Sequence, residues 1–208
     1  IGNPPKNSQG TLGTPSGQQT QTKETHKRKT TQNKTNKNRQ NKIEKLGKWN
    51  RIFLAILWTW TLLIAGTPYV NEENSTGDLS GSVGKYDNEE VIEMMNPISR
   101  FVYYLGDVNC HQLSHRSYEY NGNQMSFCAR DFGIFLGLAM GFTYSLGRRI
   151  ELTLPLIILA LTPIGIDGTV QLLTVYESTN PKRIITGLIA GVATGIALKI
   201  IADSLDNR

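Results

Sequence analysis

Chemically reactive side chains are scarce in this sequence. Its 208 residues include two cysteines and three histidines. It contains no G-x-G-x-x-G dinucleotide fingerprint, no phosphate-binding P-loop and no H-E-x-x-H metalloprotease motif. These absences argue against nucleotide-dependent enzymes and against the common zinc proteases.

Most of the scarce residues are concentrated in one segment, residues 110–131, which reads CHQLSHRSYEYNGNQMSFCARD. This segment holds both cysteines, two of the three histidines and two arginines, and it leads directly into a glycine-rich apolar run. Such clustering predicts a polar site at the mouth of a membrane segment.

Positive charge is concentrated at the start of the chain. Residues 1–51 carry twelve Lys or Arg and two Glu, so they hold a charge of +10 while the remainder holds −5. Residues 1–48 have almost no apolar side chains to bury, and we predict that they form a disordered basic tail. The tail lacks aromatic residues for stacking on bases, so nucleic acid is not an expected partner. We expect a cytoplasmic flank that touches anionic membrane lipids.

Charged residues are also absent from residues 52–70, a run long enough for one membrane span. Three shorter apolar runs follow, at 132–147, 152–166 and 184–198. Together they predict an all-α fold in a domain covering residues 49–208. The expected architecture is a polytopic, multi-pass protein of the cell membrane with about four transmembrane helices.

Residues 91–108 differ from these runs because Glu93, Arg100 and Asp107 would be costly to immerse in lipid. Their aromatic side chains suit a membrane interface. We predict one amphipathic helix here, lying on the membrane or docked on the helical bundle.

Glycines recur every four residues on two of the apolar runs. This spacing makes a smooth helix face that allows close backbone approach, either between these helices or between copies of the chain in a homo-oligomer. The six glycines are Gly133, Gly137, Gly141, Gly187, Gly191 and Gly195.

The positive tail orients the chain with its N-terminal side in the cytoplasm. Two predicted spans separate residues 110–131 from residues 175–183, so both loops lie on the same membrane face, expected to be the outer one. Asp167 and Gln171, one helical turn apart, lie at the same end of the intervening span. Polar residues of these segments can therefore converge on one site.

Four motifs in this region resemble the family of predicted membrane proteins known as domain of unknown function 2085, found in archaea and bacteria. The motifs occur in order over roughly residues 95–200 and leave the tail and the first span outside. The resemblance implies a helical membrane architecture and a polar site, and it implies no reaction. The residues that carry it are Cys110, His111, Gln112, Arg116, Ser117, Cys128, Arg130, Gly133, Gly137, Asp167, Gly168, Gln171, Glu177, Ser178, Asn180, Arg183 and Gly187.

One position departs from the family pattern. Where many members read Cys-Ala-Arg-Cys, this chain has Asp131 after Cys128, Ala129 and Arg130. A second cysteine would make a typical metal-ligand pair, and the aspartate makes any metal site less rich in thiolate.

Three kinds of chemistry, and one structural alternative, remain open for the polar residues. A metal site would draw on Cys110, His111, His115, Cys128 and Asp131, whose donor atoms are of the kinds that zinc accepts, although the sequence does not identify the ion. A lipid-headgroup or other anion site would draw on Arg116, Arg130, Arg183, Asn180 and Gln112. A membrane enzyme acting on a lipid or lipid-linked substrate would draw on Cys110, His111, Asp167 and Glu177. The structural alternative is a Cys110–Cys128 disulfide that staples the loop to the bundle.

Overall fold

The computed structural model describes residues 2, 46–148 and 150–207. A compact unit begins at Gly47, and the predicted disordered tail falls almost entirely outside the described residues. The unit is mostly helical, as expected. Its elements are α2 (Lys48–Val70), α3 (Glu89–Glu93), α4 (Pro97–Asn109), the short 3₁₀ helix η1 (Ser114–Arg116), strands β1 (Glu119–Tyr120) and β2 (Asn123–Gln124), α5 (Ala129–Ser145), α6 (Leu154–Leu173) and α7 (Asn180–Asp206).

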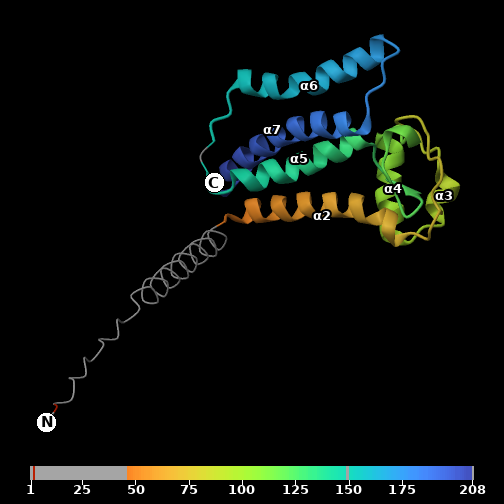
Figure 1. Cartoon of the computed structure of the whole chain (residues 1–208), viewed down its shortest axis with the longest axis horizontal. Coiled ribbons are helices and arrows are strands. Elements are labelled where there is room, and N and C mark those ends of the chain that lie inside the picture. The colour runs from red at the N-terminus through yellow and green to blue at the C-terminus, as the bar shows by residue number, and fades with distance from the viewer. Residues whose placement is uncertain (1, 3–45, 149, 208) are drawn as a thin grey trace. The chain divides into compact units, whose positions relative to one another are not determined.

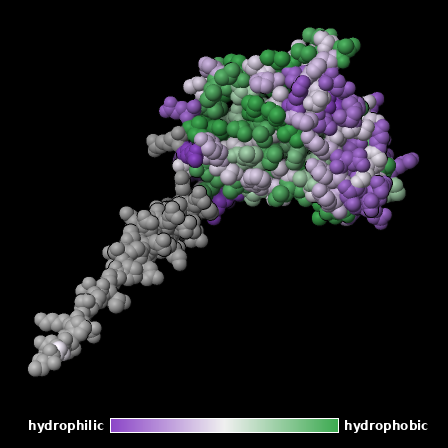
Figure 2. Space-filling model, in the orientation of Figure 1, coloured by the Kyte–Doolittle hydropathy of each residue, from purple (hydrophilic) through white to green (hydrophobic). Residues whose placement is uncertain are grey.

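Three helices, α2, α6 and α7, are long and apolar enough to cross a membrane. They contain the runs predicted at 52–70, 152–166 and 184–198. The fourth run lies in α5, a helix of 17 residues. These four helices run side by side, and α4 stands across one of their ends (Figure 1). Hydrophobic residues cover the long helices on the face shown in Figure 2, while hydrophilic residues gather over the end that carries α3 and α4.

The six glycines form the contact between α5 and α7. A Cβ atom added to Gly137 would collide with the carbonyl oxygen of Leu188, and one added to Gly191 with that of Ile134. The other four glycines also face backbone carbonyl oxygens of the opposite helix. The two glycine faces therefore pack against each other within one chain. Self-association through these same faces would require α5 and α7 to separate.

The prediction of a single amphipathic helix over residues 91–108 was wrong, because this segment forms two helices. α3 ends at Glu93, and α4 begins at Pro97. Asn96 causes the restart: its side chain accepts hydrogen bonds from the backbone N–H groups of Ile98 and Ser99, at 3.1 and 3.0 Å, and so caps α4. Proline in the first turn then fits a helix start.

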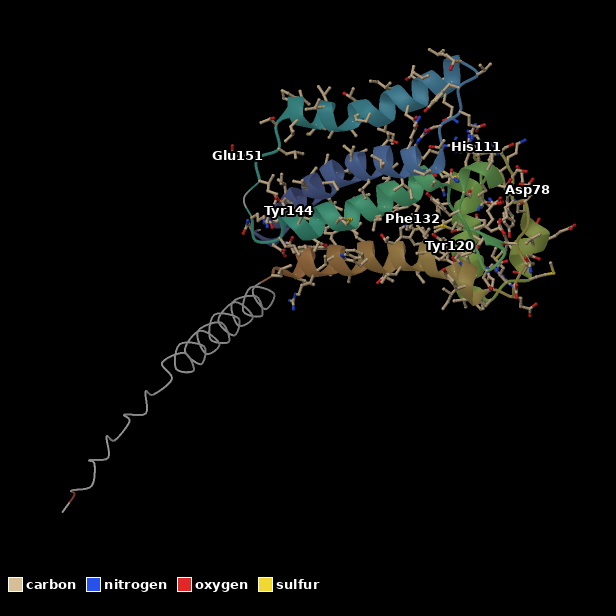
Figure 3. All side chains as sticks on the ribbon, viewed as in Figure 1. Asp78, His111, Tyr120, Phe132, Tyr144 and Glu151 are labelled. Carbon is tan, nitrogen blue, oxygen red and sulfur yellow. The ribbon has the colours of Figure 1, made fainter. Side chains whose placement is uncertain are left out.

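Contacts at the two ends of α2 show which segments of the chain lie at each end of the helical bundle. At its start, the backbone N–H of Trp49 donates to the carboxylate of Asp206, near the end of α7, over 2.8 Å. At its C-terminal end, the carbonyl oxygen of Pro68 accepts a hydrogen bond from the side-chain N–H₂ of Asn123, in the loop that holds the cysteines. His111 and Tyr120 lie at this second end, and Tyr144 and Glu151 lie at the opposite one (Figure 3). We call the second end the site end.

Candidate functional site

A small β-hairpin shapes the loop between the two cysteines. β1 and β2 pair antiparallel around Asn121 and Gly122, whose φ angles are both positive. Asn-Gly is the preferred sequence for such a two-residue turn. The all-α prediction missed this hairpin, although the Asn-Gly pair was a signal that could have located it.

Asn123 anchors the hairpin to α2 and to the chain that follows it. Its side-chain N–H₂ donates to the carbonyl oxygens of Pro68 and Glu72, both at 2.9 Å, and its side-chain oxygen accepts from the backbone N–H of Thr76 at 2.9 Å. The side chain is fully buried, so these bonds replace all of its contacts with water. Sequence reasoning did not select Asn123, because nothing local distinguishes it.

Gln112 holds the first part of the loop against the second. Its side-chain N–H₂ donates to the carbonyl oxygen of Ser126 over 2.8 Å, and its own carbonyl oxygen accepts from Gln124. Its backbone has a φ of 43°, which is uncommon outside glycine and turns the chain sharply after Cys110. These bonds bring the chain after Cys110 back alongside the chain before Cys128.

The two cysteines and Asp131 meet at the start of α5. The sulfur atoms of Cys110 and Cys128 and a carboxylate oxygen of Asp131 all lie within 4.8 Å of one another. The Cys128 sulfur is 3.2 Å from Asp131 Oδ2, and the backbone N–H of Cys128 donates to the Cys110 sulfur at 3.4 Å. Both cysteines are free thiols. The donor set is therefore two sulfurs and one oxygen.

The environment of Cys110 favours its protonated form when nothing else is bound. Its hydrogen bond with Cys128 and its burial both raise the pKa of the Cys110 thiol, and the charge of Asp131 adds to this effect. A cation placed among the three groups would reverse this preference, because metal ligation requires the thiolate.

A cavity of about 210 Å³ opens beside this cluster. Three arginines line it, Arg116, Arg130 and Arg183, each from a different segment of the chain. Arg183 is only 2% exposed although it is charged. The remaining wall comes from Val83, Asn109, Cys110, His111, Gln112, Leu113, Cys128, Asp131 and Gln171.

Glu177 ties the loop after α6 to the cysteine loop. Its Oε1 lies 2.8 Å from His115 Nε2, accepts from Arg116 Nε at 2.9 Å, and accepts from Arg183 at 3.4 Å. The hydrogen bond from Arg116, with that from His115, lowers the pKa of the Glu177 carboxyl. Asn180 adds a second tie by donating to the carbonyl oxygen of Ser117 over 3.1 Å.

Arg130 ties α5 to α6. Its guanidinium donates to the carboxylate of Asp167 and, over 3.2 Å, to the side-chain oxygen of Gln171. The two α6 residues are one helical turn apart, so a single arginine side chain reaches both.

Several polar atoms of residues around the cavity have no hydrogen-bond partner among the residues that the structure describes. Two are buried donors, Arg130 Nε and Gln171 Nε2, and one is a buried acceptor, Gln112 Oε1. Gln112 is fully buried and yet lines the cavity. Buried polar groups are normally satisfied, so water or a polar ligand in the cavity would complete the hydrogen bonding of such groups.

The structure brings together most of the residues that the sequence singled out, in three groups. Cys110, Cys128 and Asp131 form the donor cluster, while His111 lines the cavity without joining that cluster and His115 lies against Glu177. The anion candidates Arg116, Arg130, Arg183 and Gln112 all line the cavity, and Asn180 lies behind it as the acceptor of a bond from Arg183.

The four catalytic candidates do not share one point. Cys110 and His111 line the cavity, whereas Asp167 and Glu177 bind arginines from outside its wall. An acid or base at Asp167 or Glu177 would therefore act through an arginine rather than directly on a ligand in the cavity.

Comparison with known proteins supports the membrane assignment. The sequence pattern of the predicted membrane proteins DUF2085 matches residues 110–197. The chain is 39% identical over 99 residues to the uncharacterized protein MJ1492 of Methanocaldococcus jannaschii, covering 45% of this chain and 64% of that one. It is 34% identical over 95 residues to an uncharacterized protein of Methanothermobacter thermautotrophicus, covering 44% of this chain and 86% of that one. The match thus spans less than two thirds of the first relative's length. No solved structure matches significantly.

Proposed function

The chain belongs to the DUF2085 family of predicted membrane proteins, and we propose that it binds a transition metal ion beside an anion-binding cavity at one membrane face. The metal ligands are Cys110, Cys128 and Asp131. The donors of the cavity come from the three arginines and Gln171.

The proposal includes four membrane crossings, with α5 as the second. α2 ends at the site end, and α6 also ends there, because Gln171 accepts from Arg130 at the start of α5. If both α2 and α6 cross toward this end, the chain must return across the membrane between residues 71 and 153. In that interval α5 is the described helix that packs lengthwise against α7.

The proposed orientation follows from charge. The strongly basic residues 1–51 lead into α2 and belong on the cytoplasmic side, which places the site end on the outer face. α4 then lies across the bundle at the outer interface, where its exposed Ile98, Phe101 and Tyr104 meet the lipid headgroup region.

Zinc is the metal that best suits the donors. Bonds of about 2.3 Å to sulfur and about 2.1 Å to oxygen place tetrahedral ligands about 3.5 Å apart. The three ligand atoms already lie within 4.8 Å of one another, so small side-chain rotations would bring all three within bonding distance of one zinc ion. A fourth position would face the cavity and accept water or a ligand, an open arrangement typical of functional rather than structural zinc sites.

The observation that carries the metal proposal is the convergence of Cys110 with Cys128 and Asp131 across 18 residues of loop. A structural disulfide would need only the two sulfur atoms. A third donor on the first turn of α5, 3.2 Å from one sulfur, adds a ligand that a disulfide would not use.

Metal analysis of the purified full-length protein tests this proposal. We expect one equivalent of zinc in the wild type and none in Cys110→Ser or Cys128→Ser. His115→Gln serves as the control, because His115 is also a possible ligand by type but binds Glu177. A metal-free wild type whose two thiols are oxidised to a disulfide would overturn the metal proposal in favour of a covalent staple.

The anion half of the proposal rests on a separate observation, the unpartnered donors at Arg130 Nε and Gln171 Nε2. An anionic oxygen in the cavity would satisfy both and would strengthen them as charge-assisted bonds. Its test is thermal unfolding in the presence of inorganic phosphate. We expect phosphate to raise the melting temperature of the wild type and to leave Arg130→Gln and Gln171→Met unchanged.

A further inference from the structure

An apolar groove on α6 adjoins the arginine-lined cavity. The groove has a volume of about 490 Å³ and is lined by one face of the helix, with Tyr176 closing its end. Its apolar positions, Leu159, Pro163, Ile166 and Val170, recur at helical spacing. No residue of α6 is buried, and Leu159 and Ile166 of this face are 67% and 59% exposed.

One ion pair separates the groove from the cavity. Asp167 lines the groove, whereas Arg130 and Gln171 line the cavity, and Arg130 binds both α6 residues. Asp167 is only 9% exposed on its side chain. An ionisable pair at the end of an apolar groove in a membrane helix marks a place where a polar group and a hydrocarbon chain meet.

The length of the groove matches one half of a bilayer. From Leu159 to Val170 a helix rises about 16 Å, at about 1.5 Å per residue. One leaflet of the hydrocarbon core is about 15 Å thick, half of about 30 Å. A hydrocarbon chain lying in the groove would thus extend from the site end to about the middle of the membrane.

We propose that the cavity and the groove together hold one membrane amphiphile, with a phosphate headgroup in the cavity and its hydrocarbon chain along α6. The headgroup oxygens accept from Arg130 Nε and Gln171 Nε2, and the buried Arg183 adds positive charge behind them. This inference rests on the anion-binding half of the proposed function and assigns the anion to a lipid rather than to free phosphate.

Photolabelling of the full chain in alkyl maltoside micelles, which contain no phosphate, tests the assignment. The probe is an alkyl phosphate with a diazirine on its chain, and an alkyl glucoside of the same chain length reports nonspecific lipid contact. We expect the phosphate probe to label residues 159–170 about tenfold more than the neutral probe, the selectivity that one or two charge-assisted hydrogen bonds provide. Arg130→Gln and Gln171→Met should each abolish the excess.

Two matched variants locate the chain of the probe. Ile166→Trp fills the groove and should remove the excess labelling, whereas Ile158→Trp on another part of α6 should keep it. The two isoleucines are 59% and 58% exposed, so both variants should fold alike. Equal labelling by the two probes, in a protein that inorganic phosphate still stabilises, would overturn the amphiphile and leave the anion site standing. Loss of the phosphate effect itself would instead count against the anion site.

Discussion

Arg130 at the start of α5 is paired with Asp167 near the end of α6. The side chains are 23% and 9% exposed, so the pair is largely removed from water. It connects a helix packed into the bundle to one that has no buried residue of its own. The position of α6 thus depends on this pair, on the loop that follows and on its packing against α7.

Breaking the pair should destabilise the protein. Asp167→Asn leaves the Arg130 guanidinium without its counter-charge, and we expect a loss of about 2 kcal/mol, below the ~3–5 kcal/mol of a fully buried pair because Arg130 is partly exposed. Unfolding in detergent measures the loss. The double variant Arg130→Met with Asp167→Leu should lose less than the two single variants combined, and strict additivity would contradict the coupling.

The glycine contact between α5 and α7 should tolerate no side chain. Gly191→Ala places a methyl group against the carbonyl oxygen of Ile134, so the helices must separate, and we expect a loss of about 2 kcal/mol or more. Gly165→Ala is the matched control, because a Cβ atom there meets nothing within 4 Å. It should be neutral or slightly stabilising, since alanine favours helix over glycine. Thermal unfolding of both variants gives the comparison.

Asp206 should stabilise the start of α2 from the other end of the chain. Its carboxylate accepts from the backbone N–H groups of Trp49 and Asn50, at 2.8 and 3.1 Å, and so acts as the N-cap that the helix's own sequence does not supply. We expect Asp206→Ala to lower the stability of the protein, because the first backbone N–H groups of α2 lose their acceptor. Ser204→Ala, an exposed change nearby, should cost little. Equal effects in denaturant unfolding would show that the cap contributes nothing.

Acid should loosen the loop after α6. Because the folded-state pKa of Glu177 is lowered, its contribution to stability is present above the ordinary glutamate value and is lost as the pH falls through the lowered one. We expect stability to decline as the pH falls below the ordinary pKa of glutamate, about 4.3. In Glu177→Gln, the part of this decline that Glu177 causes should disappear. Unfolding curves recorded across this range measure the difference, and an unchanged pH profile in the variant would contradict the assignment.

The third proposed metal ligand, Asp131, can be replaced by a stronger one. Asp131→Cys adds a thiolate at a position whose carboxylate is already 3.2 Å from the Cys128 sulfur. Because zinc binds tightly to thiolate-rich sites, we expect affinity to rise by about tenfold or more, whereas Asp131→Asn should weaken it. Competition with a chromophoric chelator measures both. A rise in affinity for Asp131→Asn would argue that the carboxylate is not a ligand.

Hydropathy was enough to predict the long apolar helices. Residues 52–70, 152–166 and 184–198 all lie in long apolar helices, because the cost of exposing apolar residues and unpaired backbone in a membrane depends on local sequence alone. The break between α3 and α4 was missed, although Asn96 and Pro97 were a visible signal for it. The hairpin at Asn121 and Gly122 was also missed, although the Asn-Gly pair was a visible signal for it.

Which reactive residues meet was decided only by the tertiary structure. The sequence placed five candidate metal ligands in one loop, and folding gathers Cys110, Cys128 and Asp131 while His115 turns to Glu177, 62 residues away. The groove on α6 likewise exists because α6 stands apart from its neighbours except at Arg130 and α7. The physical reason is the range of the forces involved. Burial of an apolar run is a local property, but the loop takes its shape from hydrogen bonds such as that from Asn123 to Pro68, which join residues 55 positions apart in the sequence.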